Sequence, residues 1–179
     1  MKILIASDLH GDAKRCEELI MRWDSEGAER LLLLGDILYH GPRNDLPPGY
    51  EPKRVIEMLN SRFERIDSVR GNCDAEVDGM VLEFDVLTAE KRFDISGLTI
   101  LATHGHHLDK ADFSGCDVVF YGHTHIPAKE NICRVWLLNP GSLSIPKEGS
   151  DFSYMTLEGR CFEWKRLSDG SVYDSLVLQ

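Results

Sequence analysis

The chain has 179 residues, a formal net charge of −10 at pH 7, and 42% hydrophobic against 28% charged residues. This is the composition of one soluble globular domain, which we expect to span residues 1–179. Because nucleic acids are held by Lys and Arg that neutralise phosphates, so acidic a chain is not expected to bind a nucleic-acid polymer. No apolar run approaches the roughly 20 residues of a membrane span, so no membrane partner is expected.

The cysteines favour a reducing compartment. All five are scattered and form no C-x-x-C pair, which argues against a disulfide framework or a thiolate zinc site and predicts a cytoplasmic location. The opening "MKILIASDLHG" has a short apolar run that Asp8 ends, and no small-residue cleavage site follows it. We interpret it as a first strand rather than a signal peptide.

The first part of the chain alternates strands with helices. Buried apolar runs predict strands at 2–7, 30–36 and 66–72, and helical periodicity predicts helices at 12–27 and 52–63. Strands joined in this way through helices form right-handed crossovers and a parallel sheet.

After Asp74 the pattern changes to short strand-like runs separated by turn signals. We predict strands in 82–87, 91–97, 98–105, 116–125 and 132–142, with a tight turn at Ser96-Gly97, and alternating strands across 152–178. Antiparallel strands are expected here. The whole chain is therefore predicted to be an α/β domain with two sheets and helices outside.

Polar side chains follow the predicted strands at the points where these end. They are Asp8, His10, Asp36, Asn72, His104, His123 and His125. Each alone has an ordinary explanation, such as a turn, an N-cap or a hydrogen-bonded surface histidine. In open α/β sheets, however, ligands bind beyond the carboxyl ends of the strands. The joint occurrence therefore predicts one shared metal site.

The ordered motifs carry a resemblance to a known family. "DLHG" (8–11), "GD" (35–36), "GNCD" (71–74), "THGH" (103–106) and "GHTH" (122–125) occur in the order found in the calcineurin-like metallophosphoesterase superfamily. The stretches "YHGPRNDLPPGY" (39–50) and "NPGSLSIPK" (139–147) are similar to its small bacterial YfcE-type phosphodiesterase branch. The resemblance implies a four-layer α/β/β/α sandwich of two mixed sheets flanked by helices.

The resemblance also implies two divalent metal ions. One would be held by Asp8, His10, Asp36 and His125, the other by Asp36, Asn72, His104 and His123, with Asp36 bridging. Carboxylate, amide and imidazole donors without thiolate suit Mn²⁺ as first choice, with Fe, Zn²⁺ or Ni²⁺ as alternatives. Such a pair of ions holds a bridging hydroxide, because cations lower the pKa of bound water toward about 7.

Further residues near these motifs are candidates for other roles. His106 is interpreted either as a catalytic general acid or phosphate donor, or as a residue that orients a metal ligand. Many members of the superfamily have a histidine where this chain has Cys73, and a thiol is a poor proton donor to an alkoxide. Asp74 is expected to hydrogen-bond locally or to support a metal-bound histidine.

The proline-rich loop 39–52 follows the bridging Asp36. It is either a stiff surface connection or a substrate-binding segment, in which case His40, Arg43 and Asn44 would contact the phosphoester. Arg43 is the best bidentate candidate. The segment 139–142 is either a turn or part of the site.

These observations predict a metal-dependent phosphodiesterase that acts on a small soluble phosphoester. The alternatives are a phosphomonoesterase or dinucleoside polyphosphate hydrolase, and a non-catalytic protein-binding scaffold, because a fold does not fix a function. An intact set of donors favours an enzyme over the scaffold. The sequence is compatible with a homo-oligomer but does not require one.

Overall fold

Two mixed β-sheets make up most of the chain. The structure is a computed structural model that describes residues 1–179. The first sheet has the order β11-β10-β9-β1-β2-β3 and comprises β1 (Lys2–Ala6), β2 (Arg30–Leu33), β3 (Ile66–Ser68), β9 (Ser153–Glu158), β10 (Cys161–Arg166) and β11 (Val172–Val177). The second has the order β4-β5-β6-β8-β7 and comprises β4 (Glu90–Ile95), β5 (Leu98–Thr103), β6 (Val118–Phe120), β7 (Ala128–Ile132) and β8 (Val135–Asn139).

The predicted parallel pairing is confirmed in the first sheet. β1 pairs in parallel with β2, and β2 with β3, through the helices α1 (Ala13–Glu26) and α2 (Pro52–Asn60). The later strands β9, β10 and β11 continue this sheet in antiparallel register. In the second sheet β5, β6 and β8 run parallel, so the antiparallel arrangement expected after Asp74 is wrong for these three strands. The edge strands β4 and β7 run antiparallel to their neighbours.

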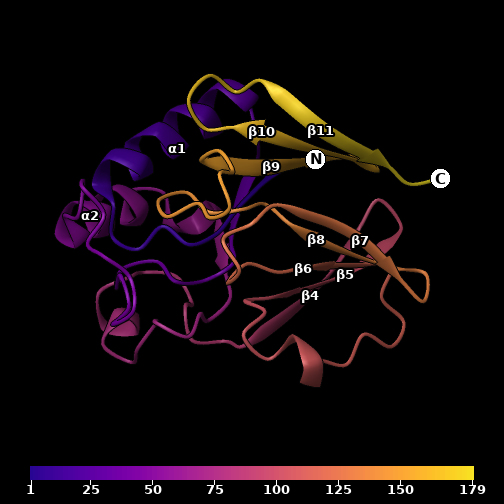
Figure 1. The fold of residues 1–179 in the computed structure, drawn as a ribbon, viewed down its shortest axis with the longest axis horizontal. Coiled ribbons are helices and arrows are strands. Elements are labelled where there is room, and N and C mark those ends of the chain that lie inside the picture. Colours follow the sequence, from indigo (N-terminus) through magenta and orange to yellow (C-terminus); the bar gives the residue numbers. More distant parts are fainter.

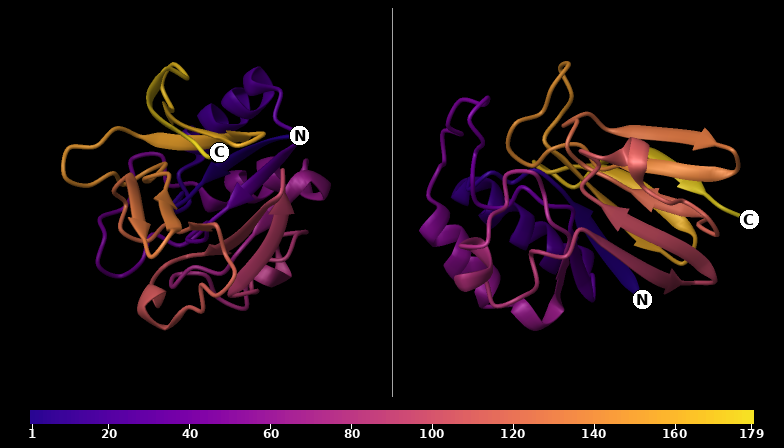
Figure 2. Two further views of the ribbon diagram at one scale, coloured as in Figure 1. Left: turned by 90° about the vertical axis from the view of Figure 1, so that its right-hand side faces the viewer. Right: turned by 90° about the horizontal axis from the view of Figure 1, so that it is seen from below.

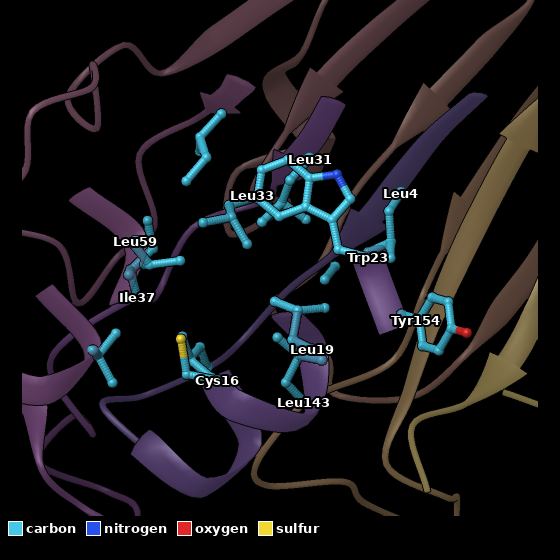
Figure 3. Packing of buried hydrophobic residues seen from close by; sticks show 14 of the residues in the cluster. Leu4, Cys16, Leu19, Trp23, Leu31, Leu33, Ile37, Leu59, Leu143 and Tyr154 are labelled. Atoms are coloured by element: carbon cyan, nitrogen blue, oxygen red, sulfur yellow. The ribbon is translucent and has the colours of Figure 1, made fainter. Parts of the chain in front are cut away.

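Helix α1 shows how the sequence fixes one of these crossovers. Asp12 caps its first turn by accepting a hydrogen bond from the Arg15 backbone N–H, and Gly27 ends it with a left-handed φ of 62°. Leu19 and Trp23 lie on its buried face, where Figure 3 shows them packed beside leucines of β1 and β2. The predicted helix 12–27 is therefore confirmed almost to the residue.

Three apolar clusters separate four layers. The largest lies between the helices and the first sheet, the second between the two sheets, and the third on the outer face of the second sheet. Figure 1 shows α1 and α2 on the side of the first sheet that faces away from the second. The fourth layer is formed by the loop 104–117, whose short 3-10 turn η3 (Leu108–Lys110) contributes Leu108 to the outer cluster.

Three predicted segments differ from the structure, and strand β7 lies largely where no strand is predicted. The run 82–87 is not a strand, although Leu82, Phe84 and Val86 alternate inward into the core. β3 is the edge strand of its sheet, and the run packs through its side chains without a ladder. The predicted strand 132–142 starts within a hairpin turn at Cys133-Arg134, and β8 begins only after that turn. The predicted helix 52–63 ends at Asn60, before the 3-10 turn η1 (Phe63–Arg65).

The tight turn at Ser96-Gly97 is confirmed. Both residues have positive φ, 54° and 73°, as a two-residue turn of the primed type requires, and they join β4 to β5. No helix of the chain is long and apolar enough to cross a membrane.

Candidate metal centre

All seven predicted donors lie beyond the carboxyl ends of strands, and they come from both sheets. Asp8 and His10 follow β1, Asp36 follows β2, Asn72 follows β3, His104 follows β5, and His123 and His125 follow β6. The two sheets bring these ends together, because Asp8 Oδ1 of the first sheet lies 3.3 Å from His125 Nε2 of the second.

The first group of donor atoms comes from Asp8, His10 and His125. His10 Nε2 lies 3.7 Å from Asp8 Oδ1 and 3.4 Å from His125 Nε2. All three side chains are buried, and their donor atoms lie within 4.8 Å of one another. A single cation placed among them would be reached by one oxygen and two nitrogens.

The second group is built around Asp36 and His104. Asp36 Oδ2 lies 3.4 Å from His104 Nε2, which in turn lies 3.1 Å from Asn72 Oδ1. The ring of His123 is centred 5.2 Å from that of His104. Asp36 Oδ2 is also 3.8 Å from His10 Nε2, so this carboxylate stands between the two groups.

Backbone carbonyls fix the tautomer of three of the histidines. The Nδ1 atoms of His10, His104 and His125 lie 2.8, 2.6 and 2.6 Å from carbonyl oxygens, to which they donate. With a proton fixed on Nδ1, Nε2 is the nitrogen of each ring that faces the centre and can bind a metal ion. This is the usual arrangement of metal-bound histidine, in which a partner on the other nitrogen orients the ring.

The electrostatics of the cluster fit a cation. Asp8 Oδ1 is buried and accepts no hydrogen bond. Burial opposes ionisation of Asp8, but the His125 imidazole at 3.3 Å and the neighbouring imidazoles of His104 and His10 hold its pKa well below the usual range. Burial likewise opposes protonation of His104, yet the hydrogen bond with Asp36 raises its pKa to about 9. Metal binding at His104 would therefore displace a proton.

Many of the donors adopt unusual backbone conformations. Asp8, His10, Asp36, His123 and His125 all have φ between 48° and 65°. Non-glycine residues rarely adopt this left-handed region, and clusters of such residues are typical of functional sites.

Two motif glycines allow two loops of the site to pack more closely than any residue with a Cβ would permit. A Cβ at Gly35 would meet the backbone of Gly71, and a Cβ at Gly71 would overlap Asp36. The loops that carry Asp36 and Asn72 therefore pack directly on each other. The sequence explains these glycines as turn formers, and the structure gives close packing as the reason.

Asp74 supports the site through the backbone rather than through a histidine. Its carboxylate accepts hydrogen bonds from the N–H groups of Asp36, Ile37 and Gly71, at 2.8, 2.9 and 2.7 Å. Burial, aided by the charge of Asp36, raises the pKa of Asp74 to about 6. Its carboxylate makes no hydrogen bond to a histidine, so the structure does not support the alternative role of orienting a metal-bound histidine.

The segment 139–144 also belongs to the site. Asn139 donates to the Gly122 carbonyl at 2.8 Å and to the Thr124 hydroxyl at 3.1 Å. The hydroxyls of Ser142 and Ser144 both donate to the Asp8 carbonyl, at 3.0 and 2.9 Å. These contacts hold the loops of Asp8 and His125 against each other, a role that the sequence pattern leaves open.

A polar cavity of about 460 Å³ opens above the cluster. Its walls include four of the donors together with Arg43, Asn44, Cys73, Thr124 and Lys147. The structure thus brings Arg43 and Asn44 to the cavity. Lys147 ends the stretch 139–147, but the sequence analysis assigns it no role, because a single lysine in a loop does not indicate where its side chain lies.

His40 lies elsewhere in the same loop. Its ring packs edge-on against Tyr39 and Tyr50, at centroid distances of 4.6 and 5.4 Å, and it does not line the cavity. Its carbonyl accepts a hydrogen bond from the Asn44 amide at 2.8 Å. This contact fixes Asn44, the neighbour of Arg43.

His106 is exposed beside the second group, with its ring 5.5 Å from that of His104 and 6.1 Å from that of His123. Burial and the charge of His104 lower its pKa. Cys73 lies closer to the centre, and its N–H donates to Asp36 Oδ1 at 2.8 Å. Burial and the Asp36 charge raise the pKa of the Cys73 thiol to about 12, so the sulfur stays protonated at neutral pH.

Two facing sheets with carboxylate, amide and imidazole donors at one rim define a metallophosphoesterase type of fold and site. In agreement, residues 1–160 match the calcineurin-like phosphoesterase superfamily domain. The chain belongs to this superfamily and is a phosphoester hydrolase.

Individual relatives extend the likeness over the whole chain. Phosphodiesterase YfcE of Escherichia coli K12 is 39% identical, with 99% of this chain and 98% of YfcE covered. A solved structure of YfcE from E. coli superposes with a TM-score of 0.95 at 37% identity over all of both chains. The probable metallophosphoesterase YsnB of Bacillus subtilis is 31% identical over 88% of this chain and 85% of its own. Vps29 of Entamoeba histolytica, at 21% identity over 99% of each chain and a TM-score of 0.63, shares the fold.

Proposed function

We propose that the chain is a metal-dependent phosphodiesterase that hydrolyses small phosphoesters at a dinuclear centre. The observation that carries the proposal is the convergence of donor atoms from Asp8, Asp36 and three buried histidines at one rim. The 39% identity to the phosphodiesterase YfcE over the full length supports the diester as substrate.

The two groups of donor atoms correspond to two sites. Asp8, His10 and His125 would hold one divalent ion, and Asn72, His104 and His123 the other, with Asp36 between them. When bound, such ions supply Lewis acidity toward the phosphate oxygens and a hydroxide at neutral pH. Mn²⁺ remains our first choice, because the donors are oxygen and imidazole nitrogen without thiolate.

The remaining groups of the chain would handle the substrate. Arg43 and Asn44 line the cavity and would bind the non-bridging phosphate oxygens. His106 has a lowered pKa and is neutral at pH 7, so we assign it a hydrogen bond to the phosphate or to the leaving group. His40 would act from outside the cavity by fixing Asn44.

Steady-state hydrolysis of bis(p-nitrophenyl) phosphate and p-nitrophenyl phosphate, each with Mn²⁺, Zn²⁺, Ni²⁺ or Fe²⁺, tests this proposal. We expect a larger kcat/KM for the diester and the largest rate with Mn²⁺. Faster turnover of the monoester would favour a phosphomonoesterase instead. That second candidate draws support from Lys147, which gives the cavity a second cation that a dianionic substrate could use. Calorimetry in which metal-free protein binds no Mn²⁺ would favour the scaffold.

A further inference from the structure

Two permanent cations face the cavity from opposite loops. Arg43 lies in the loop after β2 and Lys147 in the loop after β8, and both line the cavity above the donors. Both views of Figure 2 show these two loops, purple and golden, projecting from the same end of the molecule. The cavity wall contains one carboxylate, that of Asp36, which belongs to the metal cluster.

Neither cation is engaged by the protein itself. The side chains of Arg43 and Lys147 are exposed and take part in none of the ion pairs of the chain, whereas cations such as Lys129 and Arg166 each pair with an aspartate. In a chain of net charge −10, two unpaired cations in a cavity wall whose one carboxylate belongs to the metal cluster are suited to an anionic ligand.

The loop of Arg43 is tied to one side of the candidate metal centre. The Tyr39 carbonyl at its start accepts the hydrogen bond of His10 Nδ1 at 2.8 Å. At its other end, the Glu51 N–H donates to the Gly11 carbonyl at 2.9 Å. Both ends of this loop are therefore anchored on the segment that follows β1.

The loop of Lys147 is tied to the opposite side. The Ile145 carbonyl accepts from His125 Nδ1 at 2.6 Å, and the Lys147 N–H donates to the His125 carbonyl at 3.2 Å. Because His10 Nε2 and His125 Nε2 are 3.4 Å apart, the two loops are anchored to adjacent donors. The positions of both cations are thus coupled to the geometry of the metal cluster.

Charge balance indicates what these cations bind, given the proposed function on which this inference rests. Two divalent ions, when bound, would be balanced by the carboxylates of Asp8 and Asp36, one hydroxide and the single charge of a diester. The charges of Arg43 and Lys147 remain in surplus. We infer that Lys147, across the cavity from Arg43 at the scissile phosphate, forms a subsite for a second anionic group, so that the preferred diester carries a further phosphate beyond the scissile one.

Two matched substrates test this subsite. Thymidine 5′-(p-nitrophenyl phosphate) and the same compound with a 3′-phosphate have identical scissile bonds and leaving groups. We expect the 3′-phosphorylated substrate to have a kcat/KM about tenfold higher, mainly through KM, because charge-assisted hydrogen bonds are worth more than about 1.4 kcal/mol. Lys147→Met should lower the kcat/KM of the 3′-phosphorylated substrate about tenfold and that of the simpler diester much less, which removes most of the preference. Lys147→Arg should retain it.

Lys53→Met provides the matched control, because Lys53 is exposed on α2 and does not line the cavity. Calorimetric titration with thymidine 3′,5′-bisphosphate and thymidine 5′-phosphate gives a readout independent of turnover. Lys147→Met should weaken the bisphosphate about tenfold and the monophosphate little.

The outcomes separate the inference from the proposed function. If the wild type hydrolyses both diesters equally, the subsite is wrong and the phosphodiesterase assignment stands. If Lys147→Met lowers kcat/KM equally for both substrates, Lys147 acts on the scissile phosphate and the subsite is also wrong. If neither diester nor bis(p-nitrophenyl) phosphate is hydrolysed with any of the metals, the proposed function itself fails.

Discussion

His10 Nε2 and His125 Nε2 face each other at 3.4 Å, and each ring donates its Nδ1 proton to a backbone carbonyl. Two imidazole lone pairs directed at the same point repel each other unless a cation or a proton lies between them. Burial, the largest influence, lowers the pKa of His10, so a proton there is disfavoured. The pair is therefore arranged for a metal ion.

This arrangement predicts that metal stabilises the folded protein. Adding Mn²⁺ to metal-free protein at about 100 times its Kd should raise the free energy of unfolding by about 2.7 kcal/mol for each occupied site. Thermal unfolding with and without Mn²⁺ measures this effect. His125→Ala should lose much of the increase, whereas His107→Ala, at an exposed neighbour of His106, should keep it. An equal increase in both variants would contradict the site.

Asp36→Asn should remove turnover and bind less metal at both sites. The asparagine can still accept the hydrogen bond from the Cys73 N–H, but it supplies no negative charge between the two groups of donors. We expect kcat/KM for bis(p-nitrophenyl) phosphate to fall by at least about 100-fold, the loss seen for changes even outside the coordination shell. Metal analysis and kinetics measure it, with Asp45→Asn as an exposed control in the following loop. Near-normal activity would rule out the bridge.

His106→Ala should lower kcat by roughly 100-fold while metal content stays the same, as expected for a group that assists proton transfer or phosphate binding. The ring lies outside the donor groups, 5.5 Å from that of His104. His107→Ala is the adjacent control. Loss of metal in the His106 variant would show instead that this histidine supports a ligand.

Cys73→His should extend the range of leaving groups. The thiol, with a pKa raised to about 12, is a weak acid beside the cavity. An imidazole at this position could protonate a departing alkoxide, so diesters with alkyl leaving groups should gain in kcat, and p-nitrophenyl diesters should change little. Cys73→Ser is the matched control and should gain in neither. A plot of log kcat against leaving-group pKa that is equally steep in both variants would contradict this role.

Glu26 should contribute stability that is lost in acid. Its carboxylate accepts hydrogen bonds from Lys165 at 2.8 and 2.9 Å, from Lys2 at 2.7 Å and from Tyr154 at 2.9 Å. Burial opposes its ionisation, but these partners lower its pKa below 4.5. The stabilisation is therefore present above pH 4.5 and disappears as the pH falls through the lowered value.

Glu26→Gln should cost about 1–3 kcal/mol at pH 7 and less at pH 3. Urea unfolding of metal-free protein at both pH values measures the difference, and the absence of metal keeps acid release of ions out of the comparison. Glu64→Gln, at a residue that makes no side-chain ion pair, is the control. A difference that stays constant with pH would exclude the ionised carboxylate as its cause.

The sequence predicts the first sheet well because its signals are local. Buried apolar runs, the Asp12 cap and the Gly27 stop determine α1 and its neighbouring strands without tertiary information. The run 82–87 has the alternation of a strand, but whether a partner lies beside it is a tertiary property. The turn at Cys133-Arg134 lacks the Gly and Asn that mark such turns, although both residues have positive φ.

The donors are predictable for a different reason. Motifs at strand ends identify Asp8, Asp36 and the histidines, and the topology alone brings those ends together. Lys147 has no such pattern, and its place in the cavity follows from hydrogen bonds of its loop to His125. The separation of His40 from Arg43 likewise depends on packing against Tyr39 and Tyr50.

The left-handed backbone at five of the donors has an evolutionary consequence. Each such residue costs of order 1 kcal/mol, less for aspartate, and glycine would avoid the cost. A descendant with glycine in place of these donors would have a more stable fold but would lose its metal ligands. These donors therefore persist only while hydrolysis is under selection. Without that selection the fold can be retained for another function after the donors are lost.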